Sequence, residues 1–184
     1  MNIFGLFDRQ KDFIKRLEQS QGRLHRLALS WCHNRALAED LAQEALSKAI
    51  AKGGQLRELE SMESWLFGIL ANCLNDHYRR HRELIDLDEV EEQHLAGGST
   101  PEDECCQNQM VLRVRRAIAR LPVGQRQVVT LVDLEEFSYA DVAAILGIPV
   151  GTVMSRLCRA RQALKEMLLE ARPIQTVTNI ARFK

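Results

Sequence analysis

The side chains best suited to chemistry in this sequence are the cations and polar groups of residues 150–168. Drawn as a helix at about 100° per residue, this stretch has one apolar and one polar side. The polar side carries Met154, Ser155, Cys158, Arg159 and Gln162, with Thr152, Arg156 and Arg161 along its edges. Guanidinium and hydroxyl groups gathered on one helix face suit the phosphates and base edges of DNA. The expected chemistry is therefore binding to a nucleic acid.

A helix-turn-helix at residues 137–163 would hold this face in place. Ser138 can cap a first helix, with Asp141 three residues later in a capping-box-like position. Gly147 suits the left-handed residue that ends a helix, and Pro149 suits the start of the next one. In such motifs the early residues of the second helix enter the major groove. The simpler alternative is a helical hairpin whose arginines are only a solvated face.

A second group of cations lies at the end of the helix predicted at 64–82. Its last six residues are His77, Tyr78, Arg79, Arg80, His81 and Arg82. Cations near a helix C-terminus are favoured by the helix dipole, which explains part of this pattern without any function. Arginines interleaved with an aromatic ring and imidazoles also suit a nucleic-acid backbone and unstacked bases. His77 and His81 lack the glutamate of an H-E-x-x-H pattern, so we expect no metal there.

An acidic and polar patch occupies one side of the helix predicted at 36–51. Its members are Glu39, Asp40, Gln43 and Glu44. On composition alone this patch is an ordinary solvated helix face, and any function for it has to come from other evidence.

No residues have the spacing of an enzyme active site. There is no recognisable nucleophile with its base, no glycine-rich phosphate loop and no cluster of metal ligands. The five cysteines are an odd number without metal-ligand spacing, and Cys105 and Cys106 are adjacent. We interpret them as reduced, packed or incidental thiols. The sequence therefore predicts no catalysis, no cofactor and no metal.

The composition is that of an all-α globular protein. Hydrophobic residues make up 46%, enough for a core, while the chain has only 4 prolines, 10 glycines and 5% aromatic residues. Apolar periodicity predicts helices before the helix-turn-helix at 11–31, 36–51, 64–82, 109–121 and 125–134. No apolar run approaches the roughly 18 residues of a membrane span, and no N-terminal signal sequence is visible. We expect a cytoplasmic protein without direct membrane insertion.

The net charge of zero hides three blocks of charge. Residues 1–82 hold 13 basic and 10 acidic residues, and residues 109–184 hold 12 and 6. Residues 83–108 between them hold 9 acidic residues and no basic ones. The two basic blocks, rather than the overall pI, decide whether nucleic acid can bind.

The acidic block reads as a flexible linker, because it contains several glycines and few large apolar residues after Leu95. We therefore predict two helical domains joined by this linker. The predicted boundaries are 1–82 for the first domain, 83–108 for the linker, 109–172 for the second domain and 173–184 for a C-terminal tail, with Pro173 ending the last helix.

Residues 121–161 carry three motifs in order: LP-x₃-R, SY-x-D-V-A-x-x-L-G and G-T-V-x-S-R-L-x-R-A-R. This four-helix unit resembles the C-terminal domain, sigma region 4, of bacterial RNA polymerase sigma factors of the extracytoplasmic-function (ECF) group in the sigma-70 family. LuxR-type transcription regulators carry a related unit. This half alone leaves two classes open, a polymerase subunit and a free-standing regulator.

The N-terminal half discriminates between the two classes. The segment A-E-D-L-A-Q-E-A at 38–45 looks like the sigma-factor segment that docks on the clamp helices of the polymerase β′ subunit. The segment at 64–82 looks like the one that melts and reads the −10 element. The resemblance covers about residues 11–168, with both halves in the family's order. It therefore favours a sigma factor with a three-to-four-helix, sigma-2-like N-terminal domain.

The resemblance implies a protein that binds core RNA polymerase, directs it to promoter DNA and leaves after initiation. The residues that would bind the polymerase are Glu39, Asp40, Gln43 and Glu44. The −10 element would be read by Trp65, Asn72, Asp76, Arg79, Arg80 and Arg82. The −35 element would be read by Thr152, Met154, Ser155, Arg156, Arg159 and Arg161. For Trp65, a plain core role is equally open.

Met154 departs from the family pattern, which often has Lys or Arg at that position. A methionine cannot make the bidentate contact with guanine that Arg favours. Either Met154 contacts a thymine methyl group, or the base opposite it is not read.

The predicted linker can be checked for reach. Promoter elements roughly 25 base pairs apart are separated by about 85 Å, and a linker of 26 residues spans at most about 86–94 Å. The linker is thus long enough for the domains to read both elements. Members of the family are commonly held inactive by an anti-sigma factor, so such a partner is expected here too.

Overall fold

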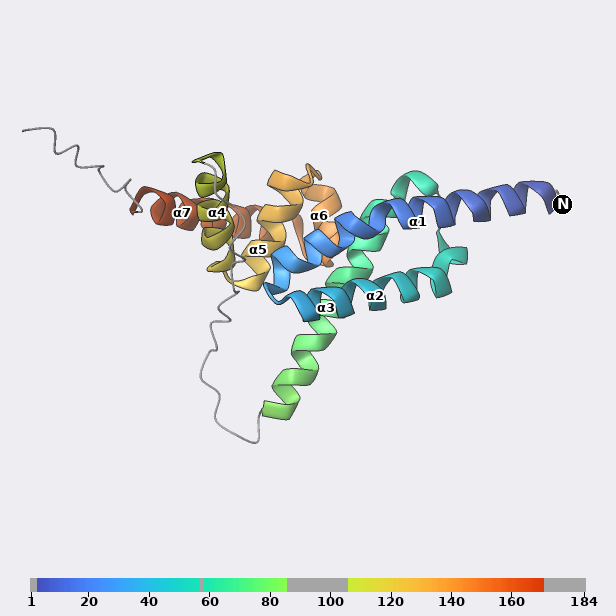
Figure 1. Cartoon of the computed structure of the whole chain (residues 1–184), viewed down its shortest axis with the longest axis horizontal. Coiled ribbons are helices and arrows are strands. Elements are labelled where there is room, and N and C mark those ends of the chain that lie inside the picture. The colour runs from blue at the N-terminus through green and yellow to red at the C-terminus, as the bar shows by residue number, and fades with distance from the viewer. Residues whose placement is uncertain (1–2, 57, 86–105, 171–184) are drawn as a thin grey trace, which may run out of the picture.

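The computed structural model describes residues 3–56, 58–85 and 106–170, which form helices and contain no strand (Figure 1). The main helices are α1 (Ile3–Cys32), α2 (Arg35–Lys52), α3 (Met62–Ile85), α4 (Cys106–Ala119), α5 (Val123–Val129), α6 (Tyr139–Leu146) and α7 (Val150–Glu170). The shorter turns are the 3₁₀ helices η1 (Gly53–Gln55) and η2 (Leu59–Ser61) and the π-helical turn η3 (Thr130–Leu134). The predicted all-α fold is confirmed.

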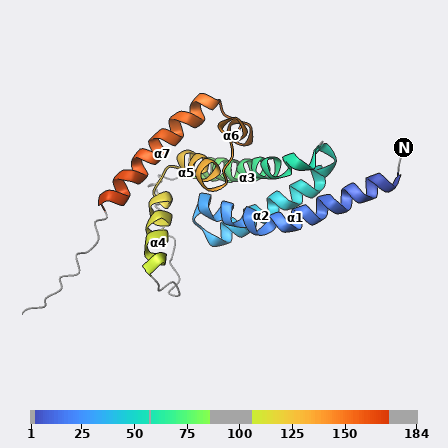
Figure 2. The ribbon, with the colours of Figure 1, turned by 90° about the horizontal axis from the view of Figure 1, so that it is seen from above.

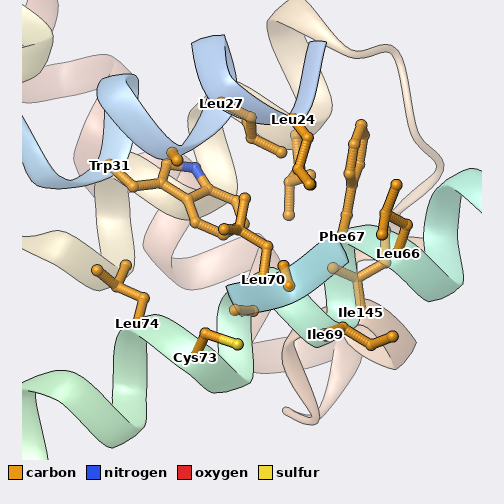
Figure 3. Packing of buried hydrophobic residues seen from close by; sticks show 14 of the residues in the cluster. Leu24, Leu27, Trp31, Leu66, Phe67, Ile69, Leu70, Cys73, Leu74 and Ile145 are labelled. Carbon is orange, nitrogen blue, oxygen red and sulfur yellow. The ribbon is translucent and has the colours of Figure 1, made fainter. Parts of the chain in front are cut away.

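The N-terminal half is a unit of three packed helices, α1 to α3. The side chain of Asn34 caps α2 by accepting a hydrogen bond from the Leu37 N–H at 3.1 Å. The residue before it, His33, has a φ of 51° and so allows the abrupt turn from α1 into α2. Apolar faces repeating at helical spacing meet inside this unit, where Trp31 and Leu70 are fully buried (Figure 3).

The C-terminal half contains α4 to α7. The helix predicted at 125–134 is present in two parts, because α5 passes at Thr130 into a single π-helical turn. The Thr130 hydroxyl lies 2.9 Å from the Arg126 carbonyl oxygen and 3.0 Å from that of Gln127. Such bonding back to the preceding turn competes with the helical ladder and accompanies its widening. Glu136, with a φ of 60°, then redirects the chain toward α6.

The predicted linker is helical at both ends, since α3 continues to Ile85 and α4 begins at Cys106. The rest of it, 86–105, lies outside the described residues. So do the tail predicted at 173–184 and the helix end predicted at Pro173.

The two halves pack against each other and share one hydrophobic core, which the sequence pattern did not indicate. Helix α6 lies against α3, and α5 lies against the end of α1 (Figures 1 and 2). Figure 3 shows Ile145 of α6 among side chains of α3 such as Leu66 and Ile69. The two predicted helical units are therefore in contact in this structure.

Candidate nucleic-acid interface

Helices α6 and α7 form the predicted helix-turn-helix and meet at 103°. The Ser138 hydroxyl accepts a hydrogen bond from the Asp141 N–H at 3.1 Å and donates one to the Asp141 carboxylate at 2.6 Å. Gly147 has a φ of 63°, a left-handed conformation that strains a residue with a side chain. The Pro149 carbonyl accepts a hydrogen bond from the Thr152 N–H at 2.9 Å as α7 begins. The predicted turn chemistry is confirmed.

Helix α7 has the two faces that its sequence predicts. Val153, Leu157 and Ala160 are buried between α7 and the helices it packs on. The opposite face is exposed and carries Met154, Ser155, Cys158, Arg159 and Gln162. Met154 is 54% exposed. An apolar thioether thus stands in the middle of a polar surface, where a partner's apolar group can reach it.

The three arginines of this surface lie in different settings. Arg159 is exposed and forms no ion pair with any residue the structure describes. Arg156 is half-buried, and its guanidinium lies over Gly124 of α5. Arg161 pairs with Asp133, with one of its two hydrogen bonds at 3.2 Å, and this bonding raises the pKa of Arg161. Among the residues that the structure describes, Arg161 has a carboxylate partner, whereas Arg156 and Arg159 form no ion pair, and of these two Arg159 is the more exposed.

The C-terminal part of α3 presents Asn72, Arg79 and Arg80 to solvent. The Asp76 carboxylate pairs with Arg79 at 3.1 Å, and the Asp76 backbone carbonyl accepts a hydrogen bond from Arg80 at 3.3 Å. Asp76 therefore holds both guanidinium groups beside one turn of the helix. Arg82 lies in α3, but its side chain is outside the described residues.

His77 and His81 stack on each other, with ring centroids 4.6 Å apart. Burial lowers the pKa of His77, and the neighbouring His81 and Arg80 lower it further, so the neutral ring is favoured. Over residues 3–56, 58–85 and 106–170, no three His, Cys, Asp or Glu side chains gather as metal ligands do.

Trp65 is half-buried and packs on Phe13 of α1, with ring centroids 6.4 Å apart at an angle of 59°. This contact ties the start of α3 to α1. Of the two open interpretations of Trp65, the contact supports packing, while the exposed part of the ring leaves room for a second contact.

The polar patch of α2 faces solvent. Glu39, Asp40 and Gln43 are exposed, and Glu44 is half-buried. Glu39 and Glu44 are paired within the helix, at 3.2 and 2.8 Å from their basic partners four residues away. Asp40 has no such partner among the described residues, so its charge is the one available to another molecule.

Helix α1 adds polar groups to this patch. Glu39 and Gln43 line one side of a shallow groove, and Glu18, Gln21 and His25 of α1 line the other. These α1 residues are not among the predicted site residues. Their spacing of three and four residues could have indicated this polar surface, because it places the three side chains on one side of a helix.

Two family models match the chain, one in each half, and their order along the chain is the predicted one. The model of sigma-70 region 2 matches residues 17–83, and that of sigma-70 region 4 matches residues 112–164. The ECF RNA polymerase sigma factor EcfG of Rhodopseudomonas palustris is 37% identical over 148 residues, which are 79% of this chain and 78% of that protein. The chain belongs to the ECF sigma factors.

Other relatives agree. ECF sigma factor SigM of Mycobacterium tuberculosis is 35% identical over 148 residues, covering 79% of this chain and 71% of that protein. The ECF sigma-E factor of Escherichia coli is 33% identical over 134 residues, covering 68% and 70%. This sigma factor therefore directs promoter-specific initiation by RNA polymerase, and the LuxR-type alternative is not favoured.

Solved structures support the same fold. Sigma factor RpoE of Bartonella quintana, determined with the anti-sigma factor NepR, has a TM-score of 0.73 and 34% identity to this sigma factor, over 88% of this chain and 99% of that one. CnrH, determined with the cytosolic domain of CnrY, has a TM-score of 0.61 and 22% identity, over 88% of this chain and 90% of that one. At this identity the similarity supports the fold alone.

In the part of this sigma factor that the structure describes, no single helix has the length and apolar character needed to cross a membrane. The sharply bent pair α6 and α7 passes the same test of length and composition when its two helices are taken together.

Proposed function

We propose that this sigma factor holds core RNA polymerase through the exposed side of α2 and reads promoter DNA through α3 and α7. The observation that carries the proposal is the occurrence of both sigma-70 regions, in order, on one chain. It acts as a non-catalytic subunit, in the cytoplasm, and is released after initiation.

The polymerase-binding residues are Glu39, Asp40, Gln43 and Glu44, and their target is the β′ clamp helices. The exposed carboxylate of Asp40 supports this assignment, because it has no ion-pair partner among the described residues. Charged groups at such a rim steer association and fix the register of two docking helices.

The −10 element is read by the exposed side of α3, through Asn72, Asp76, Arg79, Arg80 and Arg82, with Trp65 as support. Unstacking a base costs a few kcal/mol, which contacts to the extruded base have to offset. The arginines held beside Asp76 supply cations for the backbone of the opened strand, and Asn72 supplies an amide for a base edge.

The −35 element is read by α7. Met154, Ser155, Arg156 and Arg159 lie nearest the bases, while Thr152 and Arg161 flank them at the edges. The exposure of Met154 supports contact with a thymine methyl group, because a thioether offers an apolar surface and no hydrogen-bond donor.

An anti-sigma protein is the further partner. The support is that a relative with 34% identity was determined with the anti-sigma factor NepR. Binding of such a protein would compete with binding of core polymerase.

Reconstitution with core RNA polymerase tests the proposal. We expect transcription from specific promoters, and only weak promoter binding by the isolated protein. Tight, site-specific binding by the isolated protein, with no effect on polymerase, would contradict it and favour a free-standing regulator. Sequencing the DNA bound by the reconstituted enzyme would give the promoter consensus.

A further inference from the structure

Arg161 of α7 is held by a carboxylate from a different element of the same half. Its Nε donates a hydrogen bond to Oδ2 of Asp133 at 3.2 Å, and its Nη2 donates one to Oδ1 at 2.5 Å. This is the bidentate geometry in which a planar guanidinium matches a carboxylate best. The two residues are 28 positions apart, so the contact fixes a side chain of α7 relative to the turn that precedes α6.

The turn that carries Asp133 is itself anchored. Asp133 belongs to the π-helical turn η3, in which Thr130 and Leu131 are fully buried. The Glu135 N–H donates to the Thr130 carbonyl, and the Phe137 N–H donates to the Leu131 carbonyl, each at 3.0 Å. The carboxylate is therefore presented from a backbone that is fixed on both sides of it.

The stability of the fold does not explain this ion pair. The side chains of Arg161 and Asp133 are 52% and 32% exposed, and ion pairs in contact with water contribute little to stability. A carboxylate at the edge of a DNA-binding surface also repels phosphates and so weakens the general attraction to DNA. The pair is better explained by the way in which it presents Arg161.

Asp133 occupies only one edge of the guanidinium. An arginine has five N–H donors, and the bidentate contact uses two of them. Hydrogen bonding to Asp133, and a weaker interaction with Tyr139 at the start of α6, raise the pKa of Arg161. Among the described residues no other side chain contacts these donors, so at least two N–H groups can still reach a phosphate oxygen.

Arg161 lies at the distance along α7 at which a phosphate is expected. The early residues of a recognition helix reach the base edges, and Met154 and Ser155 are exposed there. Arg161 follows Met154 by about two helical turns, or roughly 10.5 Å along the axis, on nearly the same face. The major groove is about 12 Å wide and about 8.5 Å deep, so a side chain two turns further on lies near its phosphate-lined rim.

We propose that Asp133 is a positioning residue for promoter recognition, which holds the Arg161 guanidinium in the orientation that meets a backbone phosphate beside the −35 element. The proposal rests on the function proposed above, because it assumes that α7 reads this element. Phosphate contacts carry no sequence information, but they fix the register of a helix on the bases. A guanidinium that is ordered before binding also loses less conformational freedom when the complex forms. Asp133 thus favours the specific register, while its own charge opposes binding in every register.

Asp133→Asn separates these two effects in polymerase reconstituted with the full chain. The amide keeps the shape of the carboxylate but sets its NH₂ group against one N–H of Arg161, so the bidentate contact is lost. We expect binding to a promoter with an intact −35 element to weaken about threefold to tenfold. Binding to DNA of equal length without promoter elements should stay the same or tighten by up to about threefold, because a negative charge is removed.

Glu136→Gln is the matched control. It removes the same charge at an exposed residue three positions later, which has no ion-pair partner among the described residues. This variant should leave the ratio of promoter affinity to non-promoter affinity unchanged. Urea unfolding checks that both variants are folded, and we expect both to be about as stable as the wild type.

A double-mutant cycle tests whether Asp133 acts through Arg161. Arg161→Ala should weaken promoter binding and reduce the slope of log affinity against log salt concentration by about one, as for one lost phosphate contact. In the Arg161→Ala background, Asp133→Asn should no longer weaken promoter binding, because its target is gone.

The alternative outcomes overturn the positioning role. Promoter binding by Asp133→Asn that is unchanged, or that tightens as much as non-promoter binding, would mean that Asp133 only repels DNA or masks Arg161. Equal weakening in the Arg161→Ala background would place its effect elsewhere, and an unchanged salt slope with Arg161→Ala would remove the phosphate contact. Each of these results leaves the sigma-factor function standing. A wild-type reconstituted polymerase without any preference for promoter DNA would instead overturn the proposed function.

Discussion

The guanidinium of Arg156 lies directly against Gly124. A Cβ at residue 124 would come 2.9 Å from Nη1 and 3.1 Å from Cζ of Arg156. Gly124 belongs to the first turn of α5, so the start of that helix determines where this cation of α7 stands. A position without a side chain thus shapes the proposed −35 surface.

We expect Gly124→Ala to displace Arg156 and leave the fold intact. The displaced group is the end of a flexible side chain, and alanine is favoured over glycine in a helix by up to about 1 kcal/mol. Unfolding by urea should therefore show unchanged or slightly higher stability, while polymerase carrying the variant binds the −35 element about threefold to tenfold more weakly. A double-mutant cycle is the control. If Gly124→Ala weakens binding equally in an Arg156→Ala background, the effect does not act through Arg156.

Arg159→Ala should weaken −35 recognition by about 1–3 kcal/mol, as expected for a lost base contact. The side chain is exposed and unpaired within the described chain, so its removal should not change stability. The measurement is binding of the reconstituted polymerase to promoters that vary in the −35 element. Lys165→Ala, at an exposed position further along α7, is the matched control. An unaltered preference at every position would place Arg159 away from the bases.

Asp40→Lys should weaken the binding of core polymerase at least tenfold, because it reverses the unpaired charge of the α2 patch. Folding should be unaffected, since Asp40 is exposed. A pull-down with core polymerase gives the affinity, and circular dichroism checks the fold. The comparison is Asp12→Lys, the same change at an exposed site on α1. Equal affinities for the two variants would remove Asp40 from the interface.

Arg126→Ala should lower the free energy of unfolding by about 2–3 kcal/mol. The substitution leaves the carbonyls of Trp31, Ala119 and Leu121 buried without their donor, and this cost exceeds the relief of removing a buried charge. Urea unfolding measures the change. Arg120→Ala, at an exposed position near the end of α4, should cost less than about 0.5 kcal/mol.

Stability should fall as the pH drops from about 6.5 to about 4, in part because of His33. Burial and, to a smaller extent, the nearby positive charge of Arg126 together lower the pKa of His33 to about 4, so the folded state holds a neutral ring. The unfolded state binds a proton at higher pH, near 6.5, so stability present above that pH is lost on acidification. The loss is up to about 2 kcal/mol, allowing for partial screening by water. His33→Asn keeps a residue suited to the positive φ and should flatten this pH dependence; an unchanged slope would assign it to other groups.

The sequence predicted those parts of the fold and of the candidate site that depend on local chemistry. Ser138, Gly147 and Pro149 are turn and cap residues whose preferences act over a few positions, and all three occupy the predicted places. The two faces of α7 follow from helical periodicity alone, so the exposure of Met154 and Arg159 was predictable in the same way.

What the sequence did not predict is what covers each apolar face. Arg23 and Glu135 meet across 112 positions, and Arg126 reaches the Trp31 carbonyl across 95. Periodicity identifies a buried face but not the helix that packs on it. No pattern in the neighbouring residues therefore indicated the contact between the two halves. The ion pair between Arg161 and Asp133 was not predicted for the same reason. The widening of the helix into a π-helical turn at Thr130 accompanies a side-chain hydrogen bond, which hydrophobic periodicity does not indicate.

Two acidic residues at the end of the π-helical turn, Asp133 within it and Glu135 directly after it, form ion pairs with different helices. Asp133 holds Arg161 of the DNA-reading helix, and Glu135 holds Arg23 of the N-terminal half. A wider turn changes the direction in which successive side chains leave the backbone. Deleting one residue here would rotate the turn by about 100° and misdirect both carboxylates at once. The length of this turn, as much as its composition, is therefore a constraint on which insertions and deletions the chain can accept.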